Sequence, residues 1–360
     1  MEIFSLNPMQ RWQKEIASAI TTVEELSKKI KLTQKEIEDI KKVTGKFRMR
    51  ITPYYLSLID KNNPNCPIKK QAVPSINELC VRNEELIDPL GDEKRSPIKG
   101  ITHRYPDRLL IYPTYCCASY CRHCFRRRIV GQVDKILTPK EMDKAINYIK
   151  KHKEVKEVVL TGGDPLILPD EKIGDLLRRL KKIKHLRWLR IHTRVFVTLP
   201  YRITPGLVKI LKSVKPLYIV THVNHPKEIT PQFKKAVEMV AQAGIPIFDQ
   251  SVLLKGINDN LETLKELFYK LLEAGVKPYY LHQCDLAQGI SHFRTSVKTG
   301  IEILRKMRGF VTGLAIPFYM IDTPGGYGKV PVSYNFVKSY KNKVIKLETF
   351  KGKIKEYIEP

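Results

Sequence analysis

Short apolar runs alternate with amphipathic helical stretches over most of the chain beyond residue 108. Six runs rich in apolar or β-branched residues predict strands: Leu109–Tyr112, Glu157–Leu160, Trp188–His192, Leu217–Thr221, Ile245–Leu253 and Tyr279–His282. The stretches between them predict helices, among them Pro139–Lys151, Asp170–Lys182, Pro205–Ser213, Pro231–Ala243 and Asn260–Ala274. This alternation is typical of a parallel sheet with crossover helices. Six such units predict an α/β fold that forms a (βα)6 barrel or part of one.

The first hundred residues and the last forty follow other patterns. Apolar residues near the start recur at helical spacing, at Trp12, Ile16, Ile20 and Val23. Thr33 and Glu36 form a capping box that predicts the start of a further helix. Residues 90–97 are predicted to be a turn-rich connector, and the chain ends in a basic, strand-like tail. We therefore predict an N-terminal helical region (1–100), a barrel (101–325) and a short C-terminal segment (326–360).

The chain is strongly basic, with 64 basic and 37 acidic side chains and a formal net charge of +27. Such an excess is compatible with nucleic-acid binding. The basic residues are spread over distant helices, however, so we interpret them as solvated helix faces and expect no nucleic-acid partner. No apolar run approaches the ~18 residues needed to cross a bilayer, and Glu2 with an amphipathic start argues against a signal segment. We therefore expect a cytoplasmic protein without a membrane partner.

Three cysteines lie close together in the arrangement Cys117-x3-Cys121-x2-Cys124. Three thiolates can hold three irons of a [4Fe-4S] cluster and leave the fourth iron open to an exchangeable ligand. Zinc is one alternative, but structural zinc favours four ligands, and His123 lies between two of the cysteines with poor reach. A disulfide set is another, and the odd count of seven cysteines argues against it. The spacing favours a reactive cluster and resembles that of the radical S-adenosylmethionine (AdoMet) enzymes.

Two glycine-containing stretches add candidate chemistry. The stretch Thr161–Asp164 follows a predicted strand; its glycines would let a ligand approach the backbone, and Asp164 can accept hydrogen bonds from an ammonium group. Gly-Gly-Asp is also common turn chemistry. Near the C-terminus, Lys329 lies in a glycine-rich turn that can present its amine inside a pocket, where a lysine forms a Schiff base with pyridoxal phosphate (PLP). The alternative is an exposed lysine on a loop.

Arginines flank the first predicted strand and follow the cysteines. Arg104 and Arg108, on either side of Tyr105, can clamp a phosphate and stack on a ring. Arg126 can hold a carboxylate through two hydrogen bonds. Each set is also typical of a salt-bridged surface. Polar residues such as His222 fall at the ends of other predicted strands, where βα barrels place their active sites.

Taken together, these motifs resemble the lysine 2,3-aminomutase family of radical AdoMet enzymes. The likeness extends from about Trp12 to about Pro360 and includes His103–Arg108, Cys117–Arg128, Thr161–Asp164, His222–Pro226, Asp249–Gly256, Gln283–Leu286, His292–Thr295 and Asp322–Pro331. It implies a partial βα barrel with AdoMet and PLP facing each other in its mouth. It also implies an isomerase that interconverts free L-lysine and L-β-lysine through a 5′-deoxyadenosyl radical, with electrons from a flavodoxin- or ferredoxin-type donor.

The resemblance also implies a role for each candidate residue. The implied cluster ligands are Cys117, Cys121 and Cys124. The implied PLP contacts are Lys329, which carries the cofactor, and Arg104, Tyr105 and Arg108. The implied substrate contacts are Arg126 at the carboxylate and Asp285 and Asp322 at the ε-ammonium group. The implied AdoMet and pocket-lining positions are Thr161, Gly162, Gly163, Asp164, Arg194, His222 and Gln250.

Several alternatives stay open. One is a protein-directed mutase that acts with elongation factor P, and another is a mutase for a different amino acid, although a glutamate side chain would face two carboxylates. A radical AdoMet enzyme acting on RNA and a catalytically silent iron–sulfur protein are different classes. Long family members continue into a cysteine-rich segment that binds zinc between subunits. Because no such cysteines occur up to Pro360 and Asn260 stands at the partner position, we expect any homo-oligomer to lack zinc bridges.

Overall fold

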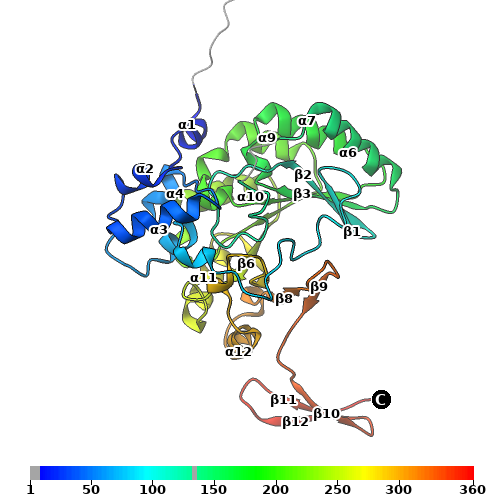
Figure 1. Cartoon of the computed structure of the whole chain (residues 1–360). Coiled ribbons are helices and arrows are strands. Elements are labelled where there is room, and N and C mark those ends of the chain that lie inside the picture. The colour runs from blue at the N-terminus through cyan, green and yellow to red at the C-terminus, as the bar shows by residue number, and fades with distance from the viewer. Residues whose placement is uncertain (1–8, 132–135) are drawn as a thin grey trace, which may run out of the picture.

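The computed structural model describes residues 9–131 and 136–360. A nine-stranded sheet, with its strands in the order β1 to β9, forms the centre of the protein (Figure 1). Strands β2 to β8 are parallel, and the outer strands β1 and β9 run antiparallel to their neighbours. The bounds are β1 Ile101–Tyr105, β2 Arg108–Thr114, β3 Glu157–Gly162, β4 Trp188–Thr193, β5 Leu217–Thr221, β6 Ile247–Leu253, β7 Lys277–Gln283, β8 Phe318–Asp322 and β9 Lys329–Pro331.

A helix of at least eight residues connects each pair of successive parallel strands, as the alternation predicts. These helices are α6 Pro139–Lys151, α7 Asp170–Lys181, α9 Pro205–Lys212, α10 Pro231–Gln242, α11 Leu261–Glu273 and α12 Val297–Met307. The predicted partial (βα)6 barrel is confirmed. The sequence did not single out β8 as a strand of this sheet, because no crossover helix follows it. It also missed β1, where His103 and Arg104 interrupt the apolar pattern.

Helix α6 shows how the local sequence sets these crossovers. Thr138 accepts a hydrogen bond from the backbone N–H of Glu141, whose carboxylate accepts one from the backbone of Thr138. Such a cap stabilises a helix by about 1 kcal/mol. Pro139 occupies the first helical position, where its missing N–H leaves no gap in the hydrogen bonding. The buried side chains of this helix are Ala145, Ile146 and Ile149, which share one face.

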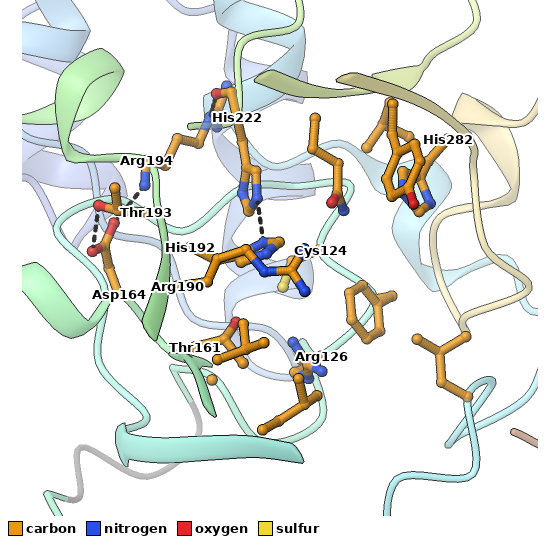
Figure 2. Close-up of a pocket in the computed structure, with 18 of the residues that line it drawn as sticks. Cys124, Arg126, Thr161, Asp164, Arg190, His192, Thr193, Arg194, His222 and His282 are labelled. Atoms are coloured by element: carbon orange, nitrogen blue, oxygen red, sulfur yellow. Dashed lines mark hydrogen bonds between the residues drawn. The ribbon is translucent and has the colours of Figure 1, made fainter. Parts of the chain in front are cut away.

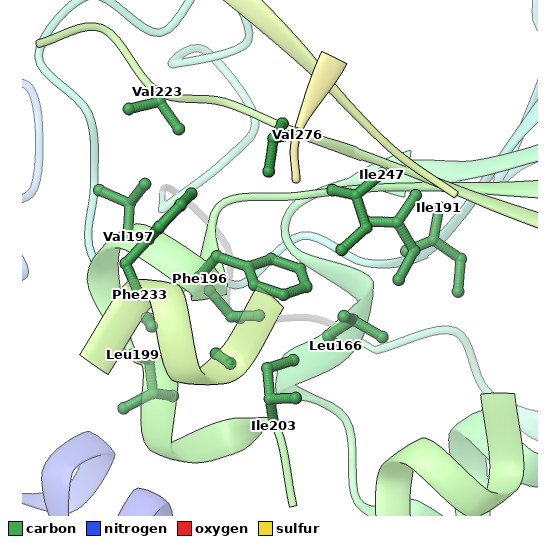
Figure 3. Close-up of a cluster of buried hydrophobic side chains, with 14 of the residues drawn as sticks. Leu166, Ile191, Phe196, Val197, Leu199, Ile203, Val223, Phe233, Ile247 and Val276 are labelled. Atoms are coloured by element: carbon green, nitrogen blue, oxygen red, sulfur yellow. The ribbon is translucent and has the colours of Figure 1, made fainter. Parts of the chain in front are cut away.

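The core beneath the barrel helices is continuous and apolar. Figure 3 shows side chains of the short helix α8 (Val195–Thr198) and of α10 meeting those of strands β4 and β6. The rings of Phe196 and Phe233 lie 6.3 Å apart at an angle of 65°, and both side chains are fully buried. Ile191 and Ile247 extend the same cluster from the sheet. Burial of each such side chain contributes about 1.5–3 kcal/mol, which fixes the strands whose ends carry the site.

Short helices precede the barrel and lie to one side of it (Figure 1). Those in the described residues are α1 Arg11–Ala17, α2 Val23–Ser27, α3 Gln34–Thr44, α4 Pro53–Ser57 and α5 Pro67–Ala72. The capping box of Thr33 and Glu36 is confirmed at the start of α3. The apolar residues that recur at helical spacing near the N-terminus do not form one helix, because α1 ends at Ala17 and Thr22 caps a new helix. Trp12 and Ile16 lie in α1 and Val23 begins α2, whereas Ile20 lies between them and pairs with Ile51.

Beyond β9 the chain forms a second, three-stranded antiparallel sheet. Its strands are β10 Val337–Lys341, β11 Val344–Glu348 and β12 Ile354–Ile358, so the strand-like tail is confirmed. Figure 1 shows this sheet projecting from the barrel at the end of an extended segment. No helix in the part of the chain that the structure describes is long and apolar enough to cross a membrane. The prediction about a signal segment concerns residues 1–8, which lie outside that part.

Candidate active site

A cavity of about 610 Å³ begins at the carboxyl ends of the parallel strands and extends into the barrel. Figure 2 shows side chains of several strands and loops converging on it. Every site residue that the sequence singles out lines this cavity: Cys117, Cys121, Cys124, Arg104, Tyr105, Arg108, Arg126, Thr161, Gly162, Gly163, Asp164, Arg194, His222, Gln250, Asp285, Asp322 and Lys329. The structure therefore brings all of them together, and their individual roles stay predictions.

The cysteines lie on the loop that follows β2, and this loop is held against the end of β3. The backbone N–H of Asp164 donates a hydrogen bond to the carbonyl of Cys116 at 2.8 Å. A Cβ atom on Gly163 would lie 2.2 Å from that carbonyl oxygen, so only glycine fits. Gly162 has φ of +104°, and a Cβ atom there would lie 2.9 Å from the side chain of Tyr112. The two glycines thus permit contact between protein segments; the approach of a ligand to their backbone stays a prediction.

Three thiol groups meet the cavity from this loop, and none of the seven cysteines forms a disulfide bond. Burial raises the pKa of Cys124 to about 11, and neighbouring Cys121 adds to the shift. The guanidinium of Arg194 donates a hydrogen bond to the sulfur of Cys121 at 2.8 Å. The described residues contain no group of three or more His, Cys, Asp or Glu side chains that could hold a metal ion. In a cluster each thiolate binds its own iron, so three sulfurs need not converge on one point.

The carboxylate of Asp164 ties the end of β3 to the end of β4. It accepts hydrogen bonds from the hydroxyl of Thr193 at 2.7 Å and from the backbone N–H of Arg194 at 2.7 Å (Figure 2). A third bond comes from the backbone of Leu166 at 3.1 Å. Burial raises the pKa of Asp164, although these donors oppose the rise. In the structure this carboxylate positions Thr193 and Arg194 beside the cavity, and the binding of an ammonium group by Asp164 stays a prediction.

Lys329 begins β9 and directs its amine at Asp322, the last residue of β8. The side-chain nitrogen lies 2.5 Å from Oδ2 of Asp322, and Nδ1 of His282 lies 3.2 Å from the same oxygen. Burial would raise the pKa of Asp322, but His282 and Lys329 outweigh it and hold that pKa well below its usual value. Burial lowers the pKa of His282 to about 4, so its ring is uncharged at neutral pH. Asp322 is therefore an ionised carboxylate that already has a cation beside it.

Asp285 lies just after β7 and differs from Asp322 in its electrostatics. Burial, and then the negative charge of Asp322, raise the pKa of Asp285 to about 7. Lys329 and Arg126 oppose this shift without cancelling it. A positive charge close to Asp285 would favour its ionised form. The carboxyl group is thus able to exchange its proton for a cation near neutral pH.

One carboxylate that the sequence did not single out holds two of the predicted binding arginines. Asp92 accepts a hydrogen bond from Nε of Arg126 at 3.1 Å on one oxygen and from Nη2 of Arg104 at 3.0 Å on the other. The carbonyl of Leu90 accepts a second bond from Arg104 at 2.7 Å. Asp92 is 3% exposed, although it falls in the predicted connector. No local pattern marks this residue, because the contact to Arg126 spans 34 positions.

Tyr105 links the first and last strands of the sheet. Its hydroxyl accepts a hydrogen bond from the backbone N–H of Lys329 at 3.0 Å. The guanidinium of Arg108 lies over the Tyr105 ring, 3.7 Å from its centroid. Gly328 has φ of +105°, and a Cβ atom there would come within 3.2 Å of the same hydroxyl. The glycine-rich turn thus allows Lys329 to approach the tyrosine that the resemblance assigns to PLP.

Two further side chains of β4 reach the cavity without having been assigned a role. His192 lies 3.3 Å from His222, ring nitrogen to ring nitrogen (Figure 2). Burial, and then Arg194, lower the pKa of His222 to about 3, so this ring is uncharged at neutral pH. Arg190 lies two residues before His192 and pairs with Glu157 at 2.9 Å. The two-residue alternation along β4 is the signal that could have found both side chains.

Comparison with known proteins decides the family. Residues 111–268 match the Radical SAM superfamily, and residues 302–360 match the family described as Lysine-2,3-aminomutase. The chain is 48% identical over 349 residues to the L-lysine 2,3-aminomutase of Acetoanaerobium sticklandii, which is 97% of this chain and 84% of that protein. The chain belongs to the lysine 2,3-aminomutase family. It is therefore an isomerase, and the family's dependence on a [4Fe-4S] cluster, AdoMet and PLP confirms the predicted cofactors.

Relatives within the lysine 2,3-aminomutase family differ in the amino acid that their names give. The L-lysine 2,3-aminomutase of Clostridium subterminale is 46% identical over 97% of this chain and 84% of its own length. The glutamate 2,3-aminomutase of Clostridioides difficile is 44% identical over 96% of this chain and 81% of its own length. Overall sequence identity therefore does not indicate which of the two amino acids is the substrate. The side chains in the cavity have to be used for that purpose.

The cavity residues fit the cofactors of the lysine 2,3-aminomutase family. Free thiols on a single loop suit a cluster with one open iron. Lys329 supplies an amine beside Arg104 and Tyr105. Within the described residues, Nε of Arg104 is buried and has no hydrogen-bond partner. A buried donor of this kind suits an anionic group such as a phosphate.

Proposed function

We propose that this chain is an L-lysine 2,3-aminomutase that interconverts L-lysine and L-β-lysine. The observation that carries the proposal is that Asp285 and Asp322 line the same cavity as Arg126. A buried ammonium group is costly unless it is paired. Two carboxyl groups and one guanidinium match the two charged ends of a diamino acid. A free amino acid with a positively charged side chain satisfies this set, and L-lysine is the one named for the relatives with the higher identities.

Arg126 is proposed to hold the substrate carboxylate. Its Nε is already bonded to Asp92 at 3.1 Å, and Nη2 lies 3.3 Å from the hydroxyl of Tyr112. These contacts fix the plane of the guanidinium before the substrate arrives. A planar, fixed guanidinium loses little entropy when it forms two parallel bonds to a carboxylate.

Asp285 and Asp322 are proposed to hold the side-chain ammonium group. Asp285 gives up its proton as the cation arrives, since its pKa of about 7 falls beside a positive charge. Asp322 becomes available to the substrate when the nitrogen of Lys329 moves away from it. His282 keeps one oxygen of Asp322 in place through the 3.2 Å contact of its Nδ1.

When bound, the cluster with AdoMet supplies the radical that removes a hydrogen atom, and PLP supplies the group that carries the migrating nitrogen. The electron is proposed to come from a flavodoxin- or ferredoxin-type donor. The chain's own residues orient the substrate and keep water out of the cavity. The uncharged ring of His222 provides a wall that does not compete for protons at neutral pH.

An anaerobic assay of the reconstituted protein with dithionite tests the proposal. We expect turnover of L-lysine and none of L-glutamate, because the glutamate side chain would face two carboxyl groups. Turnover of glutamate would overturn the proposed substrate. Modification of elongation factor P while free lysine stays inert would favour the protein-directed alternative.

A further inference from the structure

The cysteine loop has a second hollow beside it, which we call the outer cleft. This cleft of about 40 Å³ shares Cys117, Cys121 and Cys124 with the main cavity. Its other walls include Phe47 and Arg48, which follow α3. The sulfur-bearing loop thus faces two hollows at once. A substrate and AdoMet in the main cavity would leave the outer cleft free.

Phe47 and Arg48 belong to the segment 47–50, which is bonded directly to the cysteine loop. The backbone N–H of Tyr120 donates to the carbonyl of Arg50 at 2.9 Å. The guanidinium of Arg122 donates to the carbonyl of Arg48 at 2.8 Å. These bonds hold a short stretch of backbone next to the thiols, which suits electron transfer across a fixed, thin layer of protein.

The segment that carries Phe47 and Arg48 is basic. Residues 41–50 include five basic side chains and no acidic one. Among them Lys41, Lys42, Lys46 and Arg48 are exposed, and Lys41 pairs with Glu24 at 3.2 Å. We call the other three the rim residues. A patch of one sign attracts partners of the opposite sign and speeds their association. The occupant that fits the patch is therefore acidic.

We propose that the rim residues Lys42, Lys46 and Arg48 form the docking surface for an acidic one-electron carrier protein. The proposal rests on the proposed function, because a reductant is needed only where the three thiols hold an iron–sulfur cluster. The carrier is oxidised by one electron, and the cluster is reduced by that electron. No bond forms or breaks in this step. Docking at the outer cleft lets reduction proceed while the main cavity is filled.

A charge-reversed triple variant, Lys42→Glu with Lys46→Glu and Arg48→Glu, tests this surface. With a reduced flavodoxin as electron source, we expect the KM for the carrier to rise about tenfold or more and to lose much of its salt dependence. With dithionite, a small reductant, AdoMet cleavage should match that of the unmodified protein. The matched control reverses Lys182, at the end of α7, and Lys209 and Lys212 of α9. These helices lie away from α3 in Figure 1. The control should stay within about twofold in both assays, since exposed charges far from the contact are screened.

Binding without turnover provides an independent measurement. Calorimetry of flavodoxin with the cluster-free chain should give a weaker Kd for the rim variant than for the control variant. A milder variant with glutamine at the three rim positions should weaken binding in the same direction and to a smaller extent. An unchanged Kd in the rim variants, or an equal loss in rim and control variants, would overturn the docking surface. Failure of dithionite to support AdoMet cleavage by the unmodified protein would refute the proposed function instead, and the calorimetry would still decide the docking surface.

Discussion

The side-chain nitrogen of Lys329 lies 2.5 Å from Oδ2 of Asp322, the carboxylate proposed to receive the substrate ammonium group. The site thus holds, in its own lysine, the same functional group that it is proposed to bind. With the proposed roles of these two residues, cofactor anchoring and substrate selection share one anion.

Replacing Asp322 should impair the turnover of L-lysine, whereas replacing an aspartate on the surface should not. A hydrogen bond to a charged group contributes about 1.5–3 kcal/mol, so Asp322→Asn should lower kcat/KM for L-lysine by about 10- to 100-fold. Steady-state kinetics check this. Asp143→Asn is the matched control, because Asp143 is 59% exposed and pairs with Arg179 on the surface. A variant at Asp322 that keeps the kcat/KM of the unmodified enzyme would contradict the assignment.

Lys329 should be the residue that carries PLP. Borohydride reduction of the PLP-loaded protein should fix a pyridoxyl group on the peptide that contains Lys329, as peptide mass mapping will reveal. Lys338→Ala, a change in the exposed β10, should leave the label in place. A label on any other lysine would refute the assignment.

Asp285 should make the stability of the empty protein depend on pH. Its pKa is raised to about 7 in the folded protein, against about 3.9 in an unfolded chain. Between these values the folded state binds more protons than the unfolded state. The contribution of this group is therefore full at low pH and is lost as the pH rises through about 7. The melting temperature of the unmodified protein should therefore fall relative to that of Asp285→Asn as the pH rises through about 7. A relative rise in the melting temperature of the unmodified protein would argue against the raised pKa.

Substitution should distinguish the three proposed cluster ligands from the neighbouring Cys116. Cys117→Ala, Cys121→Ala and Cys124→Ala should each lose bound iron and the formation of 5′-deoxyadenosine. Cys116→Ala should keep both, because Cys116 contacts Asp164 through its backbone carbonyl, which alanine retains. An iron-poor Cys116→Ala protein would show that the assigned set of ligands is wrong.

Replacing Asp92 should weaken the binding of two ligands, PLP and lysine. Asp92→Asn removes the anion shared by Arg104 and Arg126, so both the Kd for PLP and the KM for lysine should rise, each by about tenfold or more. Absorbance titration and steady-state kinetics measure the two effects. Glu93→Gln is the control: its side chain is 73% exposed and pairs with Arg128, and exposed pairs contribute about 0–1 kcal/mol. If only one of the two constants changes at Asp92, the shared role is wrong.

The sequence predicted most of the repeated strands and helices of the barrel. It predicted few of the contacts between segments that are distant in the chain. Strands β2 to β7 and the helices between them follow from apolar periodicity, and caps such as Thr138 at the start of α6 support it. The candidate residues could be found because they belong to recognisable motifs. The contact of Asp92 with Arg126 could not be, since it depends on how a connector folds back over the barrel. For the same reason the sequence did not reveal that Gly163 leaves room for the carbonyl oxygen of Cys116.

Lys329 lies on β9, the final strand of the nine-stranded sheet in the chain as well as in space. Because a chain is synthesised from its N-terminus, the ribosome delivers this lysine after every other strand of the barrel. The backbone of Lys329 then bonds to Tyr105, on the earliest strand. With Lys329 as the proposed anchor, a nascent barrel cannot hold PLP through this residue until its sheet is complete. Since a ligand stabilises only the state that binds it, PLP in the cell would protect finished molecules and leave incomplete ones to proteolysis.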